Sequence, residues 1–355
     1  MTRERMKVMK NNLYLDIHVL QNVPPSCINR DDTGSPKTAK YGGVVRARVS
    51  SQSWKHEMRK MFREILSKEE VGIRTKKVVQ MLVDVMKEID GNIGDEEADK
   101  LALNALGNAG IKIDKDGASP VLMFFSAAQA RALANLAING SKDKKEYQNV
   151  LKESPSIDMA LFGRMVAADP SLNFDAAAQV AHAISTHAVH NEYDYFTAVD
   201  DLNQDEESGA GHLGTVEFNS STLYRYATVN IAELQKHLGL QTDIAVKCFV
   251  QAFIKSMPTG KQNTFANRTL PDYVYVALRT DQPVNLVGAF EKPVSGKNGY
   301  LEESENKFKE YAASIYKKFA CMPEKIWELG EKDIIQILEE VKATVKEKLS
   351  EREGE

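Results

Sequence analysis

The pattern of residues 23–63 predicts a loop, a strand and a helix in direct succession. This run of residues constrains the fold more than any other segment of the chain. Prolines and glycines keep 24–43 out of regular structure, and Gly-Gly ends that loop. Residues 44–49 then alternate as a half-exposed strand does. The alternation predicts that Arg46 and Arg48 lie on one side of the strand.

The helix predicted after this strand is amphipathic. Ser50 and Ser51 supply hydroxyl groups for its N-cap. Its apolar stripe has helical spacing and consists of Trp54, Met58, Met61, Phe62 and Ile65. A second face is polar and basic, with Gln52, Lys55, Arg59 and Arg63. The N-terminus of a helix offers free N–H groups and partial positive charge, so it suits a phosphate oxygen.

The run is strongly basic within a chain whose net charge is −4. It contains nine Lys and Arg residues but only three acidic ones. A phosphate backbone requires such a local excess, whereas a protein partner does not. An ordinary surface helix with solvated charges remains an equally acceptable interpretation at this point.

The rest of the chain predicts an α+β fold with a helical insertion. Residues 13–20 alternate as a strand, and 66–165 are mostly helical. Further helices are expected over 176–187, 242–257, 303–318 and 333–349, and strands over 215–231 (two, around 219–221), 273–280 and 286–290. This order fits a split βαββαβ sheet of the RNA-recognition-motif (ferredoxin-like) kind, which commonly binds single-stranded RNA.

Two further segments are candidates for binding. Residues 189–219 carry eight acidic residues and no Lys or Arg, together with three neighbouring aromatics. Such a segment is not core, so it is a disordered loop or an arm that docks elsewhere. Lys261 follows Gly260 in a second polar and basic loop.

Several classes of protein are disfavoured. No apolar run reaches the length of a membrane span and no signal peptide is evident, so a cytoplasmic protein is expected. Three distant cysteines fit a reducing compartment. The spacing of His182, His187 and His190 favours helix packing over zinc. His18 has no catalytic motif around it and is predicted to be a structural residue of the sheet.

Motifs along most of the chain resemble the CasC family, the repeated backbone subunits of the type I-E CRISPR complex called Cascade. They are HVLQNVPPSCINRDD (18–32), YGGVVRARVSSQSWK (41–55), DMALFGRM (158–165), AHAISTHAV (181–189), FTAVDDL (196–202), GHLGTVEFNSSTLYRYATVNI (211–231) and AFEKPV (289–294). The resemblance implies a hand-like molecule. Its expected parts are a palm (11–65 and 220–355, with a palm helix in 166–188), helical fingers (66–165) and a thumb (189–219).

The resemblance also implies a function without catalysis, metal or cofactor. Copies would polymerise head to tail along the spacer of a CRISPR RNA and leave guide segments for target DNA to pair with. The expected RNA-binding residues are Lys37, Arg46, Arg48, Ser50, Gln52, Lys55, Arg59 and Lys261, with Met165 and Phe196 displacing a base. Expected partners are other copies of the chain and the large, small, guide-end cap and repeat-endonuclease subunits of Cascade.

Two other functions remain open. Related backbone proteins of type III complexes cut RNA with a loop aspartate, so Asp31-Asp32 or Asp200-Asp201 could bind Mg²⁺ in a ribonuclease. No His or Lys is spaced to complete a general acid–base set, and loop capping explains Asp31 and Asp32 more simply. A protein scaffold that binds no RNA leaves the basic run unexplained.

Overall fold

The computed structural model describes residues 12–166, 170–197, 213–319 and 321–353, and it divides the chain into two compact units. The first unit comprises 1–58, 180–228 and 249–341, and the second comprises 59–179, 229–248 and 342–355. Both units contain helices and strands, which confirms the α+β class. None of the helices within the described ranges has the length and apolarity needed to cross a membrane.

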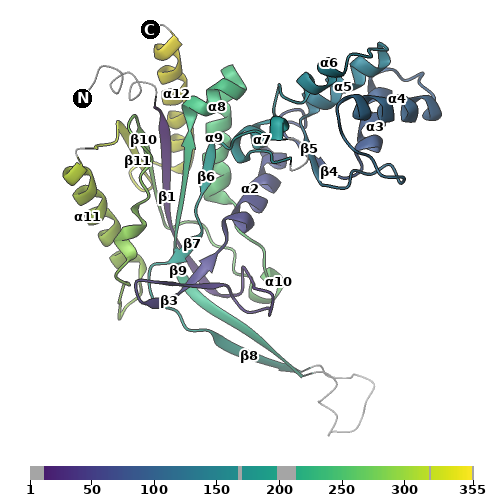
Figure 1. The fold of residues 1–355 in the computed structure, drawn as a ribbon. Coiled ribbons are helices and arrows are strands. Elements are labelled where there is room, and N and C mark those ends of the chain that lie inside the picture. The colour runs from purple at the N-terminus through teal and green to yellow at the C-terminus, as the bar shows by residue number, and fades with distance from the viewer. Residues whose placement is uncertain (1–11, 167–169, 198–212, 320, 354–355) are drawn as a thin grey trace, which may run out of the picture. The chain divides into compact units, whose positions relative to one another are not determined.

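A large antiparallel sheet forms the centre of the first unit (Figure 1). Its strand order is β11-β10-β1-β9-β7-β3-β2, with β6 and β8 also paired to β9. The strands are β1 (Tyr14–Ser26), β2 (Thr38–Tyr41), β3 (Val44–Val49), β6 (Ala178–Val180), β7 (Ala183–Ser185), β8 (Glu192–Thr197), β9 (Leu213–Asn230), β10 (Tyr273–Arg279) and β11 (Lys325–Glu328). Segments that are far apart in sequence therefore meet on neighbouring strands.

The helices outside residues 66–165 agree with the periodicity in most places. They are α2 (Ser51–Ile65), α8 (Ile231–Leu238), α9 (Thr242–Lys255), α10 (Gln262–Phe265), α11 (Leu301–Phe319) and α12 (Ile334–Glu353). Trp54 and Phe62 on the predicted stripe of α2 are fully buried. On one face of the sheet, Phe308 and Tyr316 of α11 pack against an aromatic cluster of β1, β9 and β10.

The second unit holds the predicted helical insertion. Its helices include α3 (Val78–Ile89), α4 (Asp95–Asn108), α5 (Ala127–Ile138), α6 (Lys144–Val150) and α7 (Ile157–Phe162). The same unit contains a short two-stranded sheet, in which β4 (Ile73–Thr75) pairs with β5 (Met123–Phe125). One apolar core runs from α3 to α6, and the capping box at Ser126 begins α5 as sequence rules require.

The loop predicted over 24–43 is interrupted by the end of β1 and by β2, which pairs with β3. Three further predicted elements are wrong. The helix over 176–187 is replaced by β6 and β7, because Ile184 pairs with both Arg48 and Tyr224. The two strands over 215–231 are a single long strand, β9. Leu286–Phe290 forms a 3₁₀ helix (η3) rather than a strand. In the first two cases long-range pairing overrides the local pattern.

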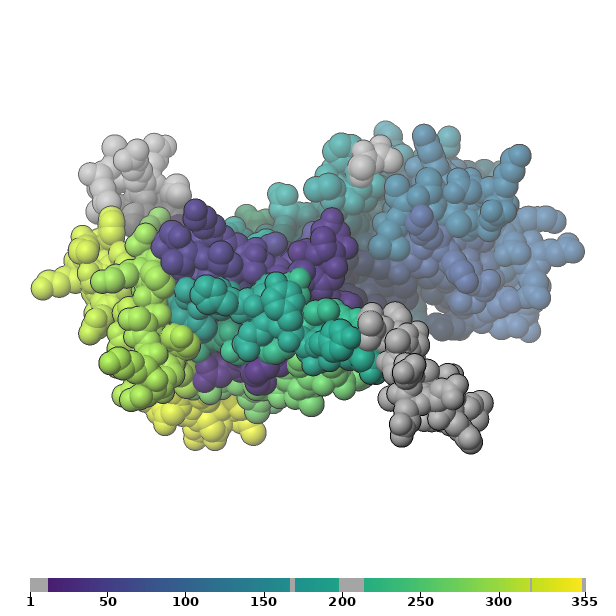
Figure 2. Space-filling model, turned by 90° about the horizontal axis from the view of Figure 1, so that it is seen from below, coloured from purple at the N-terminus to yellow at the C-terminus, as the bar shows by residue number. Residues whose placement is uncertain are grey.

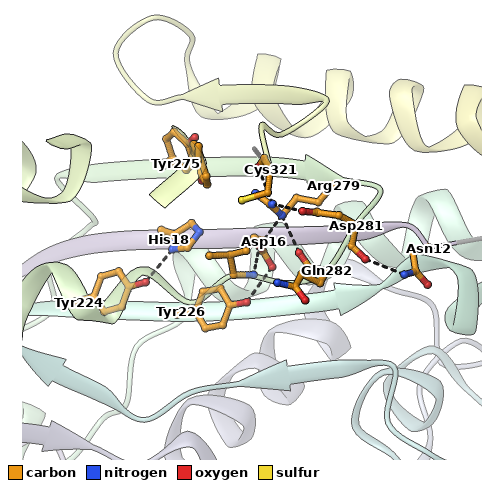
Figure 3. Close-up of polar contacts among 12 residues, drawn as sticks. Asn12, Asp16, His18, Tyr224, Tyr226, Tyr275, Arg279, Asp281, Gln282 and Cys321 are labelled. Atoms are coloured by element: carbon orange, nitrogen blue, oxygen red, sulfur yellow. Dashed lines mark hydrogen bonds and ion pairs between the residues drawn. The ribbon is translucent and has the colours of Figure 1, made fainter. Parts of the chain in front are cut away.

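His18 lies in an aromatic cage inside the sheet of the first unit, which confirms a structural role (Figure 3). Its Nδ1 is 2.8 Å from the Tyr224 hydroxyl, and the rings of Tyr226, Tyr275 and Phe308 surround it. Burial lowers the pKa of His18 to about 3. The imidazole is therefore neutral in the native state at ordinary pH.

Asp16, two residues before His18, is buried beside Arg279 (Figure 3). Its carboxylate accepts hydrogen bonds from the Tyr226 hydroxyl (2.9 Å) and the Val284 N–H (2.8 Å). Burial raises the pKa of Asp16 to about 6, although these hydrogen bonds and Arg279 act in the opposite direction. Between about pH 3.8 and 6 the native protein therefore retains a proton here that the unfolded chain releases.

These two groups predict an unusual dependence of stability on pH. Below pH 6.5 the unfolded chain protonates His18 and the native chain does not, so this term lowers stability as pH falls towards 3. Asp16 acts oppositely between about 6 and 3.8, so the two terms largely cancel there. His18→Gln removes the first term. As pH falls from 6.5 to about 4, the free energy of unfolding of the variant should rise by about 3 kcal/mol relative to that of wild type.

Urea unfolding at several pH values measures this difference. His56→Gln is the matched control, because the side chain of His56 is 68% exposed. A His18→Gln curve that stays parallel to wild type across this pH range would contradict the assigned burial effect.

Candidate nucleic-acid interface

The loop after β1, the N-terminus of α2 and the turn at Lys261 converge in the first unit. Asn29 joins the first two, because its side-chain oxygen accepts from the Ser50 N–H at 2.9 Å and its carbonyl accepts from the Lys37 N–H at 2.8 Å. Ser50 caps α2 through a contact of 3.4 Å from the Ser53 N–H to its Oγ. The predicted cap is confirmed, and Asn29 is a partner that the sequence pattern did not reveal.

Gly260 brings the third segment to this place. A Cβ at Gly260 would lie 2.4 Å from the carbonyl oxygen of Ile28 and 2.9 Å from that of Cys27, so only glycine allows the close approach. Lys261 follows with a left-handed φ of 47° and is the N-cap residue of α10. The positive charges of Arg30 and Lys261 both act to lower the pKa of Cys27, although burial raises it overall. The structure thus joins the two basic loops that the sequence showed separately.

Arg48 and Lys37 add cations beside this junction. The backbone N–H of Arg48 donates to the Lys37 carbonyl at 2.9 Å, and both residues line a small pocket with Asn29, Asn219 and Ser221. Arg48 also donates from Nε to Thr38 O (3.1 Å) and contacts His182 Nδ1 (3.1 Å) through Nη1. Burial lowers the pKa of His182, and the neighbouring Arg48 and Lys37 lower it further. The neutral His182 is thus suited to accept from Arg48.

Arg46 differs from the expectation. Its side chain is completely buried and donates to the carbonyls of Tyr41, Ser185, Phe290 and Glu291, at 2.8–3.3 Å. A buried guanidinium that joins β3 to β7 and η3 is not accessible to a phosphate. We therefore remove Arg46 from the set of expected RNA contacts.

The residues on the polar face of α2 have different surroundings. Gln52 is exposed, and Lys55 is half-buried, which lowers the pKa of its ammonium group. Arg59 belongs to the second unit, where it pairs with the buried Asp158 (3.4 Å) and stacks on Phe124. Its main contacts are therefore structural. Lys55 lies one helical turn closer to the capped N-terminus of α2, which favours it as a candidate for a phosphate.

Met165 lies in a turn of the second unit, and 86% of its surface is exposed. Its neighbours Arg164 and Val166 are buried. The Arg164 guanidinium donates to Leu172 O (2.9 Å), Phe124 O (3.2 Å) and Leu151 O (2.5 Å). An exposed methionine between two buried neighbours is held outward, so it is not the core residue that its type suggests.

Phe196 lies on an arm formed by β8 and the first part of β9 (Figures 1 and 2). It pairs with Gly214, and a Cβ at Gly214 would meet the Phe196 ring at 2.4 Å. Tyr193 and Tyr195 are 68% and 63% exposed and alternate with Phe196 along β8, so they lie on the opposite face. Within the segment expected to be a thumb (189–219), Glu192–Thr197 thus pair with 213–218, and residues 198–212 lie outside the described ranges.

Asp31 stabilises its own loop. Its Oδ1 accepts from the Thr33 N–H (2.9 Å), the Thr33 hydroxyl (2.7 Å) and the Ser35 N–H (3.0 Å). These hydrogen bonds, first that of the Thr33 hydroxyl, lower the pKa of Asp31. The predicted capping role of Asp31 is confirmed. The other proposed acidic pair, Asp200-Asp201, lies outside the described residues, and the described part of the chain contains no cluster of three His, Cys, Asp or Glu able to hold a metal ion.

The family model described as CT1975-like protein matches residues 15–352. The chain belongs to this family. This CT1975-like protein is also similar to a chain of a "CRISPR RNA-guided surveillance complex, pre-nicking", with a TM-score of 0.80 and 31% identity over 94% of this chain and 100% of that one. A second chain, from a "CRISPR RNA-guided surveillance complex", gives a TM-score of 0.69 and 27% identity over 94% and 99%. No curated protein matches. The matches agree with the predicted likeness at the level of a chain of a CRISPR surveillance complex.

Proposed function

We propose that this CT1975-like protein is a CRISPR RNA-binding backbone subunit of a Cascade-type surveillance complex. The observation that carries the proposal is the convergence of Lys37, Arg48 and Lys261 around the capped N-terminus of α2. Cations and helix N–H groups at one place suit phosphate oxygens and need no base sequence. The likeness to chains of surveillance complexes supplies the biological setting.

The proposal extends to assembly. Copies polymerise head to tail along the spacer in a type I-E arrangement, with an RNA-recognition-like palm, helical fingers and a thumb. The contact between copies is heterologous and therefore gives a helical filament rather than a closed dimer. The protein grips backbone shape, while pairing with target DNA reads the sequence. Partners are the guide RNA, target DNA and the large, small, cap and endonuclease subunits.

We further propose that the protein is not an enzyme. Asp31 and Asp32 are the described candidates for a catalytic aspartate, and Asp31 uses one carboxylate oxygen to hold residues 33–35 of its loop. Wild type, Asp31→Asn and Asp32→Asn should therefore all leave labelled RNA and DNA at full length in Mg²⁺, as judged on denaturing gels. Cleavage by wild type that disappears in either variant would make the ribonuclease the correct alternative.

The phosphate clamp predicts a change in salt dependence. Lys55→Ala and Lys261→Ala should each reduce the slope of log K against log salt for single-stranded RNA by about 0.7, because each removes one phosphate contact. The loss should be equal for guides of unrelated sequence. Filter-binding titrations at several salt concentrations measure the slope. Lys318→Ala, an exposed lysine on α11, is the control. A loss that depends on the guide sequence, with an unchanged slope, would contradict the clamp.

The exposed Phe196 and Met165 predict an effect on guide geometry rather than on affinity. One base–aromatic contact is worth roughly 1–3 kcal/mol, which is small beside several phosphate contacts. Phe196→Ala with Met165→Ala should retain RNA binding but remove the periodic pattern of chemically reactive guide bases in assembled complexes. Tyr195→Ala, on the other face of β8, should preserve that pattern. Periodic reactivity that persists in the double variant would show that these residues do not displace bases.

A further inference from the structure

The second unit carries a group of arginines outside the clamp described above. Arg59 and Arg74 each lie with the guanidinium carbon 4.7 Å from the centroid of the Phe124 ring. Arg74 is also the cross-strand partner of Phe124 in the β4–β5 pair, so the two residues are fixed side by side. Arg63 follows Arg59 by one helical turn on α2.

Close contacts and hydrogen bonds hold the residues that pack against these arginines. A Cβ at Gly72 would lie 2.4 Å from Cε2 of the Phe124 ring and 2.6 Å from the Ser156 hydroxyl, so glycine is required for the ring to sit there. Asp158 is 1% exposed, and one of its oxygens accepts from the Gly72 N–H and the Ser156 hydroxyl, each at 2.8 Å. Its other oxygen contacts the Arg59 guanidinium at 3.4 Å. Asp158 therefore orients Arg59 and anchors the group.

The charges do not balance. Asp158 compensates Arg59, whereas Arg63 and Arg74 are exposed and form no ion pair with any residue that the structure describes. The positive charges of Arg74 and Arg63 both lower the pKa of Arg59, after the larger effect of burial. Three guanidinium groups thus share one carboxylate. Concentrating like charges costs free energy unless an anion compensates them.

We propose that Arg63 and Arg74 form a second phosphodiester-binding site, in the second unit, with Arg59 and Phe124 as positioning residues. Guanidinium groups bind phosphate oxygens through two parallel hydrogen bonds, and the stacked Arg74 loses little conformational freedom on binding. Guanidinium groups that bind phosphate oxygens contact the backbone of the strand and need no particular base sequence. Its ligand is a guide RNA strand or a DNA duplex, which present the same phosphodiester chemistry.

Salt-dependent binding of the full-length protein tests this site with two probes, a single-stranded RNA and a DNA duplex of unrelated sequence. In Arg63→Gln with Arg74→Gln, the slope of log K against log salt should fall by about 1.4 for RNA or about 1.8 for the duplex. The probe whose slope falls identifies the source of the phosphates. Arg63→Lys with Arg74→Lys should restore most of the slope, because it keeps the charges.

Arg131→Gln is the matched control, since Arg131 is an exposed arginine of the same unit that already faces Glu88 at 4.0 Å. Thermal unfolding of each variant shows whether removal of the Arg74–Phe124 stack alters folding. The proposal is overturned if both slopes match wild type, or if the control lowers them equally. The Lys55 and Lys261 variants keep the two proposals apart: a fall in the duplex slope alone supports this site even where the RNA clamp fails.

Discussion

A buried guanidinium holds the first unit together. Arg225 of β9 stacks on Trp54 of α2 at 3.8 Å and on Phe253 of α9 at 4.7 Å, and it donates to Gln21 Oε1 at 2.7 Å. Its burial costs enough to lower its pKa to about 9. Stacking and hydrogen bonding offset that cost only when strand and helices meet correctly. The orientation of α2, and with it the capped N-terminus and Lys55, depends on this contact.

Arginines serve the same purpose elsewhere, which changes how a basic sequence should be interpreted. Arg46 joins β3 to carbonyls of β7 and η3, and Arg164 joins the turn that exposes Met165 to its surroundings. In each case the charged group is internal and a neighbouring residue is presented outward. The local excess of positive charge in residues 23–63 is therefore divided between structural and surface roles.

The sequence predicted those features that depend on local periodicity. Strand β3, the stripe and cap of α2 and the sheet position of His18 follow from spacing alone. Arg46 and Arg48 have the same parity on β3, so no pattern distinguishes the buried one from the part-exposed one. Residues 176–187 are rich in alanine and favour helix locally, yet they pair as strands with β3 and β9. The approach of Gly260 to Cys27 and Ile28 depends on contacts more than 200 residues apart, which no sequence window includes.

The continuity of β9 has a mechanical consequence. This strand of 18 residues, roughly 60 Å at the usual rise, runs without a break from the arm into the sheet between β1 and β7. A load applied to the arm is therefore transmitted along the strand and is resisted by its lateral hydrogen bonds in shear. The arm acts as a stiff lever rather than a tether. The length of β9 therefore sets the distance between the sheet and whatever the arm contacts.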